Sequence, residues 1–386
     1  MCIRDSQHVA GKFDLYKDIQ FSSEVKSATY RDDTRSWEIQ LQDGSKFKCR
    51  FLITGIGLLS QPTLPKIPGI DSFKGQSFHT SRWPHESVSY SGKRVAVIGT
   101  GATGVQTIQE ICKDVGHLTV FQRRPNWCAP LHNAKIEPDE MKEIRAGYEE
   151  IFETCNQTAA GFLHTADSRS TFEVSADERY EFWENLYASK GFGIWQGNFK
   201  DVLIDPKANE AMSEFVANKI RQRVEDPDTA EKLIPKDHGF GTRRVPLETR
   251  YYESYNQDNV ELVDIIETPI EKVTPDGIVT TDRSFEFDLI IYATGFDAIL
   301  GSYNKIEKIK KRVKFIKGDI RNKNLVDKAL KNKSRLKYVA SLIDGKASVS
   351  LKEINENHPF YNLQGSDNIT VFHTDRYKDS PLEVKG

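Results

Sequence analysis

The 386-residue sequence has few cysteines, few methionines and no long apolar run. Its five cysteines are odd in number and include no Cys-x-x-Cys pair, which argues against a disulfide framework and against a metal site. No stretch approaches the roughly 18 apolar residues that a transmembrane helix needs, so we expect no membrane partner. The first residues, MCIRDSQHVAG, lack the apolar core of a secretory signal, and we therefore expect a cytoplasmic protein.

An excess of charge of one sign is also absent, because the formal net charge is only -2. The distribution is uneven: Lys and Arg outnumber Asp and Glu by 19 to 10 in residues 301–386 and fall short by 35 to 46 before them. A basic tail can bind nucleic acid. This one has ordinary strand and helix patterning without an aromatic-basic stacking motif, so we expect no nucleic-acid partner. We infer no obligate protein partner either.

Strand and helix patterns alternate along most of the chain. Residues 25–53 alternate in the manner of strands, in the stretches EVKSATY, SWEIQLQDGSKFKC and RFLITGIG, with Asp43-Gly44 as a hairpin turn. Residues 61–69 contain three prolines and predict an extended linker. Apolar strands are expected at RVAVI, LTVFQ, VELVDI and FDLIIY, a charged helical block at about 135–225, and a further helix at LETRYYESYNQ. This order predicts an α/β, doubly wound, Rossmann-like fold with a helical insertion.

A glycine-rich turn joins the strand RVAVI to the helix VQTIQEIC. In this context Gly99 permits the tight turn, Gly101 lets the backbone approach a pyrophosphate, and Gly104 lets the helix pack close to the strand. A glycine turn without a ligand is the alternative. The candidate cofactor-binding residues here are Gly99, Thr100, Gly101, Ala102, Thr103 and Gly104.

The next strand ends in Gln122-Arg123-Arg124, where an NAD site usually has an acidic residue for the ribose 2′-hydroxyl. A carboxylate would repel a 2′-phosphate, whereas arginine binds it through paired hydrogen bonds. Arg123 and Arg124 therefore favour NADP over NAD. A solvated strand end is the alternative interpretation.

Residues 73–84, FKGQSFHTSRWP, fit the FxGxxxHTxxWP fingerprint, and the chain here resembles the Baeyer–Villiger monooxygenases. That resemblance covers roughly residues 12–300 and implies FAD and NADP as cofactors, with a ketone and O2 as small-molecule partners. TGIGLLSQPTLP is similar to the family's first ATG-type motif, with Thr54 and Gly55, and IIYATGFDA to the second, with Thr294 and Gly295.

The resemblance also implies roles for individual residues. The pyrophosphate would lie on the glycine turn, and the 2′-phosphate on Arg123 and Arg243. His79 would lie at a domain junction and couple NADP movement to the flavin. Arg244 resembles the active-site arginine, whose permanent charge can stabilise negative charge on reacting oxygen. Alternatively, Arg243 and Arg244 pair with surface carboxylates such as Glu248.

The sequence departs from the family at both ends. No strand–GxGxxG–helix unit for FAD precedes residue 50, residues 313–332 resemble a nucleotide-sugar epimerase, and residues 335–386 resemble homoserine dehydrogenase. The opening MCIRDS is what a transposon sequencing adapter encodes in one frame. We therefore expect a chimeric assembly with these parts: adapter residues 1–6, a partial FAD-binding remnant 7–61, an NADP-binding domain 62–130 and 240–300, a helical insertion 131–239, an epimerase-like fragment 301–332 and a homoserine-dehydrogenase-like fragment 333–386.

The function expected of the parent protein is insertion of oxygen into a ketone to give an ester or lactone. The truncated chain itself is expected to lack that activity. Two alternatives stay open: an N- or S-oxygenating flavin monooxygenase, for which Arg244 has no obvious use, and a non-catalytic NADP-binding fragment.

Overall fold

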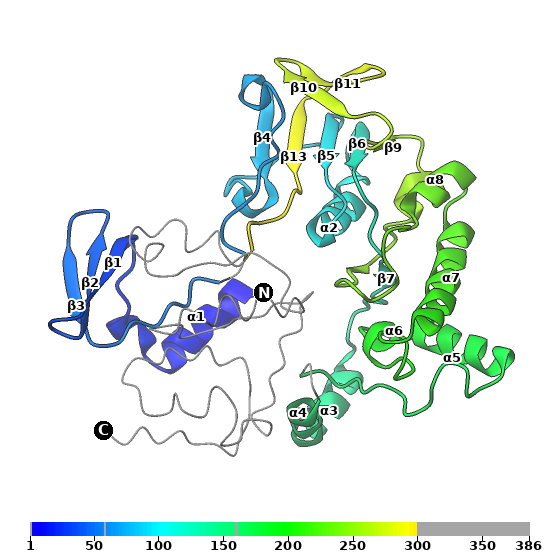
Figure 1. The fold of residues 1–386 in the computed structure, drawn as a ribbon, viewed down its shortest axis with the longest axis horizontal. Helices are drawn as coiled ribbons and strands as arrows, with labels where there is room; N and C mark the ends of the chain where they lie inside the picture. The colour runs from blue at the N-terminus through cyan, green and yellow to red at the C-terminus, as the bar shows by residue number, and fades with distance from the viewer. Residues whose placement is uncertain (1, 58, 159–160, 299–386) are drawn as a thin grey trace, which may run out of the picture. The chain divides into compact units, whose positions relative to one another are not determined.

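The computed structural model describes residues 2–57, 59–158 and 161–298 (Figure 1). The fragments expected at 301–332 and 333–386 lie outside the described residues. The described chain divides into two compact units: one runs to Thr63 and resumes at Phe296, and the other spans Leu64–Gly295. Among the described helices, none is both long and apolar enough to cross a membrane.

The first unit has little core. Helix α1 (Cys2–Lys12) and a 3-10 turn (Leu15–Asp18) precede an antiparallel sheet of β1 (Val25–Arg31), β2 (Ser36–Leu41) and β3 (Lys46–Cys49). The hairpin predicted at Asp43-Gly44 joins β2 to β3: Gly44 has a φ of 91°, and the Asp43 carboxylate accepts from the Ser45 amide.

The further strand expected within residues 50–57 is wrong, since that segment forms no strand. Phe51 is 69% exposed and Ile53 is 91% exposed. No described strand lies beside the segment, and an apolar pattern yields a strand only where a neighbour accepts its backbone hydrogen bonds.

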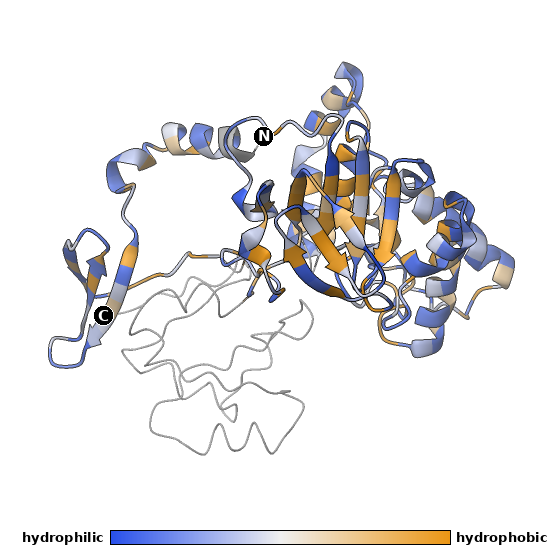
Figure 2. Ribbon diagram, turned by 90° about the horizontal axis from the view of Figure 1, so that it is seen from above, coloured by the Kyte–Doolittle hydropathy of each residue, from blue (hydrophilic) through white to orange (hydrophobic). Residues whose placement is uncertain are grey.

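The second unit is built on a parallel sheet whose order is β4-β13-β5-β6-β9. The strands are β4 (Gln76–His79), β5 (Arg94–Ile98), β6 (His117–Gln122), β9 (Val260–Asp264) and β13 (Leu289–Tyr292). Four of the five residues of β5 and all four of β13 are buried, which is why these strands are continuous apolar runs. Figure 2 shows the apolar strands grouped side by side.

Each face of this sheet is covered by a different layer. Helix α2 (Ala102–Ile111) buries Val105, Ile108 and Ile111 in one core with residues of β5 and β6. The small antiparallel sheet of β10 (Ile270–Thr274), β11 (Gly277–Thr280) and β12 (Ser284–Glu286) contributes to a second core with Phe121 and Ile290. The α/β class with a parallel, Rossmann-like sheet is confirmed.

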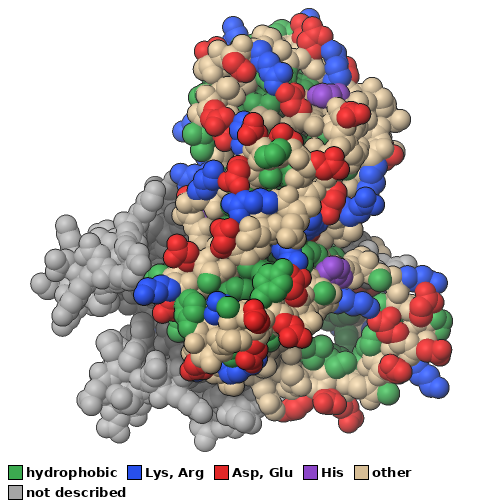
Figure 3. All heavy atoms as spheres, turned by 90° about the vertical axis from the view of Figure 1, so that its right-hand side faces the viewer, with side chains coloured by type: hydrophobic (Ala, Val, Ile, Leu, Met, Phe, Trp, Pro, Cys, Tyr) green, Lys and Arg blue, Asp and Glu red, His purple; other side chains and the backbone are tan. Residues whose placement is uncertain are grey.

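The helical block falls between β6 and β9. It comprises α3 (Pro138–Ala146), α4 (Tyr148–Gln157), α5 (Ala176–Ala188), α6 (Gly193–Gln196), α7 (Pro206–Arg223) and α8 (Pro227–Leu233). Helix α7 begins where the Asp205 side chain accepts from the amides of Lys207 and Ala208, with Pro206 in the first turn. On the face that carries α5, α7 and α8, acidic and basic side chains are interspersed (Figure 3).

The helix expected at LETRYYESYNQ is wrong. That segment forms the two-residue strand β8 (Leu247–Glu248), which pairs with β7 (Ala129–Pro130), and then a 3-10 turn at Glu253–Asn256. Arg250 lies between them with a φ of 62°, a left-handed conformation that interrupts any helix.

Candidate cofactor site

Segments from four parallel strands meet at one edge of the sheet. In the strand register, Tyr292 pairs with both His79 and Ile98, and Ile98 pairs with Phe121. The last residues of these strands and the residues that follow them therefore lie along the same carboxyl edge, where α/β folds bind their ligands. They include the predicted site residues His79, Gly99, Arg123, Arg124, Thr294 and Gly295.

The three glycines of the turn have different surroundings. Gly99 has a φ of 106°, and a Cβ on it would lie 2.5 Å from the Ala293 carbonyl oxygen. A Cβ on Gly104 would lie 2.2 Å from the carbonyl oxygen of Gly99. A Cβ on Gly101 would meet no described atom within 4 Å, and its φ of -75° is open to any residue. Packing thus explains Gly99 and Gly104, whereas Gly101 leaves free space above the start of α2.

That free space adjoins the N-terminus of α2. Gly101 caps the helix without a side-chain hydrogen bond, and the amides of the first helical turn, Ala102 to Gly104, have no acceptor within the helix. These amides and the helix dipole favour an anion. Thr100 is 4% exposed, and its hydroxyl donates to the Arg124 carbonyl oxygen over 3.0 Å, so its described contact ties the glycine turn to the end of β6.

Two of the candidate arginines share one carboxylate. Arg124 Nη1 and Arg243 Nη2 each lie 3.3 Å from Asp237 Oδ2, and His238 Nδ1 lies 2.7 Å from Asp237 Oδ1. The hydrogen bond from His238 and the nearby arginine charges hold the pKa of Asp237 below its usual value. Asp237 was missed in the sequence analysis, because the segment from Asp237 to Arg243 forms no helix or strand whose spacing could have predicted the pairing.

Arg123 and Arg244 are both exposed. Arg123 follows β6 directly, and the backbone of Arg244 is held by Asn126, whose Nδ2 donates to its carbonyl oxygen over 3.4 Å. The structure thus brings Arg124 and Arg243 together at Asp237, and it leaves Arg123 and Arg244 facing solvent.

His79 is a buried link between two strand ends. It is 4% exposed, with Nε2 3.0 Å from the Gly295 carbonyl oxygen and Nδ1 3.1 Å from the Ser81 amide nitrogen. Because an amide can only donate, Nδ1 accepts and Nε2–H donates to Gly295. Burial lowers the pKa of His79. The ring is therefore neutral at pH 7 and joins β4 to the turn after β13.

The two ATG-type segments belong to separate units. Thr54 and Gly55 follow β3 in the first unit, in the segment without a strand. Thr294 and Gly295 follow β13 in the second unit, where Gly295 has a φ of 78°.

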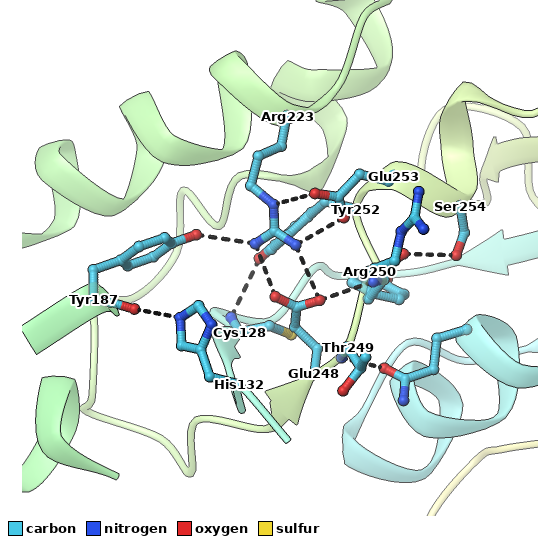
Figure 4. A network of polar contacts seen from close by, with 12 residues as sticks. Cys128, His132, Tyr187, Arg223, Glu248, Thr249, Arg250, Tyr252, Glu253 and Ser254 are labelled. Atoms are coloured by element: carbon cyan, nitrogen blue, oxygen red, sulfur yellow. Dashed lines mark hydrogen bonds and ion pairs between the residues drawn. The ribbon is translucent and has the colours of Figure 1, made fainter. Parts of the chain in front are cut away.

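A buried ion-pair network is centred on Arg223 and Glu248, and Glu248 lies four residues after Arg244 in the sequence (Figure 4). Arg223, at the end of α7, donates to Glu248 over 2.8 and 3.1 Å, to Glu253 over 2.7 and 2.8 Å, and to the Tyr187 hydroxyl over 2.9 Å. The Glu248 side chain is fully buried, and its carboxylate also accepts from the Tyr251 amide. Glu248 as a surface partner of Arg243 and Arg244 is therefore wrong.

The same network ties the helical block to the elements of the parallel-sheet unit. Cys128, next to β7, donates its amide to the Tyr252 hydroxyl over 3.3 Å. The amide of Thr249 donates to Gln109 of α2 over 2.8 Å. Helix α7, strand β8 and helix α2 are thus joined through residues that lie four to six positions after Arg243 and Arg244.

The described residues show no metal site, and the cavity among them is separate from the predicted site residues. No group of three or more His, Cys, Asp or Glu side chains within the described ranges could hold a metal ion. A cavity of about 290 Å³ lies between α5 and α7, lined among others by Arg179, Trp183 and Phe215, and it includes no predicted site residue.

Residues 4–143 match the family model of flavin-binding monooxygenase-like proteins. A monooxygenase of Pseudomonas putida acting on 2-oxo-Δ3-4,5,5-trimethylcyclopentenylacetyl-CoA is 49% identical over 311 residues, 79% of this chain and 57% of its own. Cyclopentanone 1,2-monooxygenase of Comamonas sp. is 42% identical over 308 residues, 79% of this chain and 56% of its own. The crystal structure of OTEMO with FAD and NADP matches with a TM-score of 0.77 and 49% identity, over 79% of this chain and 58% of that one.

Over that aligned length the chain is similar to these monooxygenases. It spans little more than half the length of these curated relatives. A second family model, homoserine dehydrogenase, matches residues 266–386, which supports the resemblance expected for 335–386 and extends it to an earlier residue. The described part of that range, 266–298, contributes β13 to the parallel sheet, between β4 and β5. The epimerase resemblance of residues 313–332 stays a prediction.

The described residues fit FAD and NADP, the two cofactors in the OTEMO structure, unequally. For NADP they offer the glycine turn, the open position at Gly101 and the arginines at the end of β6. For FAD, the described residues before Leu64 contain an antiparallel sheet and no strand followed by a GxGxxG turn and a helix. The chain therefore fits NADP, and its described part does not supply the ADP-binding half of a flavin site.

Proposed function

We propose that residues 64–295 are the NADP-binding part of a Baeyer–Villiger monooxygenase. The whole enzyme would use NADPH and O2 to insert oxygen into a small-molecule ketone, giving an ester or lactone, in the cytoplasm. The observation that carries this proposal is the open position at Gly101, above the start of α2 and at the carboxyl edge of the parallel sheet.

Each predicted residue has a proposed task. The amides after Gly101 bind the pyrophosphate, while Gly99 and Gly104 allow the turn to form. The arginines after β6, together with Arg243, bind the 2′-phosphate. His79 is neutral and holds the turn at Gly295 in place, so it is a positioning residue and no general base.

The exposed guanidinium of Arg244 is proposed to stabilise negative charge on the reacting oxygen. Bound flavin would supply the activation of O2. Because the described residues lack the ADP-binding half of the FAD site, we propose that this 386-residue chain binds NADP and does not oxidise ketones. Thr54, Gly55, Thr294 and Gly295 remain candidate flavin-side positions.

The experiment is cofactor binding by the purified full-length chain. We expect calorimetry to show NADP+ binding with NAD+ at least tenfold weaker, and no flavin absorbance in the purified protein. Arg124→Ala should weaken NADP+ binding and leave NAD+ binding unchanged. Stoichiometric FAD would contradict the proposed inactivity, and the chain would then be assayed on ketones and on amines or sulfides. Absence of NADP+ binding would contradict the proposal itself.

We also propose that the chain joins pieces of two proteins. Two unrelated family models match the two ends of one sequence, and the ratio of Lys to Arg changes from 18:17 before residue 301 to 15:4 after it. Amplification from the source DNA tests this directly. A single product that continues through residue 300 and residue 333 would contradict a chimeric origin.

A further inference from the structure

We propose that Asp237 is a positioning residue for nucleotide specificity: its carboxylate gathers Arg124 and Arg243 into one clamp for the 2′-phosphate and so sets the preference for NADP over NAD. This inference rests on the proposed function, because it requires the nucleotide to bind at the glycine turn. It goes beyond that function by assigning a role to an acidic residue in a site for an anion.

The carboxylate of Asp237 is held in place by the neighbouring His238 side chain. Its Oδ1 receives the Nδ1–H of His238 over 2.7 Å, and the His238 side chain is only 6% exposed. The His238 backbone is fixed in turn, because its carbonyl oxygen accepts from the indole nitrogen of the buried Trp127 over 2.9 Å. Asp237 thus has a fixed orientation that a freely rotating surface acid would lack.

The other oxygen, Oδ2, serves both arginines. Arg124 and Arg243 come from distant parts of the chain, and their positive charges repel each other. With each guanidinium nitrogen 3.3 Å from the same oxygen, the two nitrogens lie within twice that distance of one another. A phosphate can span such a gap, because its several oxygens each accept charge-assisted hydrogen bonds of about 2.8 Å.

The clamp is also tied to the glycine turn, where the cofactor is proposed to bind. The Arg124 carbonyl oxygen accepts from Thr100 Oγ1 over 3.0 Å, so Arg124 is fixed to the glycine turn itself. Arg243 reaches the same point from the loop that also carries Arg244. A nucleotide with a ribose 2′-phosphate would bind both arginines, whereas one with a 2′-hydroxyl offers no charge to bind.

Asp237 has two opposing effects on a bound phosphate. It gathers the two arginines, and it repels the phosphate dianion. The arginine contacts are direct, whereas the repulsion acts across a longer distance at a surface where water and salt screen it. The gathering effect should therefore dominate. Asp237 makes two exposed ion pairs, with Arg124 and Arg243. If both are of ordinary strength, their loss corresponds to about a fivefold decrease in affinity for NADP+.

The test is a calorimetric titration of the full-length chain, Asp237→Asn and Asp288→Asn with NADP+ and with NAD+. Asp288 is the matched control, since its carboxylate lies 3.3 Å from the partly exposed Arg94 at the opposite, amino end of β5 and β13. We expect Asp237→Asn to weaken NADP+ binding about fivefold with NAD+ binding unchanged within twofold, and Asp288→Asn to leave the ratio as it is.

Equal weakening for both nucleotides would assign Asp237 a structural role only and would overturn the inference. Tighter NADP+ binding by Asp237→Asn would also overturn it, because repulsion would then dominate. Titration of the unsubstituted chain tests the proposed function separately. If this chain shows no preference for NADP+ over NAD+, the proposed function is contradicted, and the inference that rests on it is contradicted as well.

Discussion

Removal of the buried charge at Glu248 should destabilise the protein far more than removal of an exposed one. Glu248→Gln preserves the shape of the side chain and removes the negative charge that faces Arg223. The Glu248 side chain is 0% exposed and that of Arg223 is 17% exposed, so water can replace little of the lost interaction. Breaking a buried ion pair by removal of one partner typically costs about 3–5 kcal/mol.

The structure places the expected loss at the low end of that range. Arg223 keeps Glu253, which it contacts over 2.7 and 2.8 Å, and a glutamine can still accept from the Tyr251 amide. We therefore expect Glu248→Gln to lower the free energy of unfolding by about 3 kcal/mol. Urea denaturation followed by circular dichroism should show a lower midpoint with an unchanged slope.

The matched control is Glu286→Gln, which removes a carboxylate 2.7 Å from Arg94 on a side chain that is 72% exposed. Its midpoint should equal that of the unsubstituted protein. Arg223→Met and the double variant complete a cycle, in which the double variant should lose less stability than the two single losses combined. If Glu248→Gln matches Glu286→Gln, or if the losses add within about 0.5 kcal/mol, the network does not hold the insertion.

Three further substitutions test the cofactor edge. Gly104→Ala would place a Cβ 2.2 Å from the Gly99 carbonyl oxygen, and it should lower the thermal midpoint together with NADP binding. Gly101→Ala meets open space, so we expect an unchanged midpoint and at least a tenfold loss of NADP affinity by calorimetry; full binding would refute the assignment of that space to the pyrophosphate. Because burial lowers the pKa of His79, the unfolded chain takes up a proton first as the pH falls below about 6.5, and stability should fall with it. His79→Asn should reduce that slope, measured by urea denaturation between pH 7 and 5, and an unchanged slope would contradict it.

The sequence predicted the parts of the site that depend on neighbours along the chain. The strand–glycine turn–helix unit and the Asp43-Gly44 hairpin are local patterns, and both are present. Arg250 shows the limit of such patterns: its left-handed backbone interrupts a segment with helical periodicity, and the residue type does not predict that conformation.

Pairings between distant residues were beyond the sequence. The partner of Glu248 is Arg223 on a helix of the insertion, and the partner of Arg124 is Asp237. Glu248 has Arg243 and Arg244 much nearer in sequence than Arg223, and Asp237 pairs with both Arg124 and Arg243, so tertiary packing and not sequence distance selects the partners. The strand expected at residues 50–57 failed for a related reason, because its formation depends on a neighbouring strand that the described chain does not place there.

The strand order of the parallel sheet has a consequence for synthesis of the protein. Strand β13 lies between β4 and β5, yet it is the last of the described strands of this sheet to be synthesised. The hydrogen bond that the Asp288 carboxylate accepts from the Arg94 amide joins positions 194 residues apart. Until β13 emerges, β4 and β5 each present an unpaired edge, the feature of nascent sheets that invites aggregation. Gly99 can lie close to the Ala293 carbonyl oxygen only after β13 has joined the sheet. Translation must therefore run past the whole helical insertion before the turn that would receive the pyrophosphate can adopt its final form.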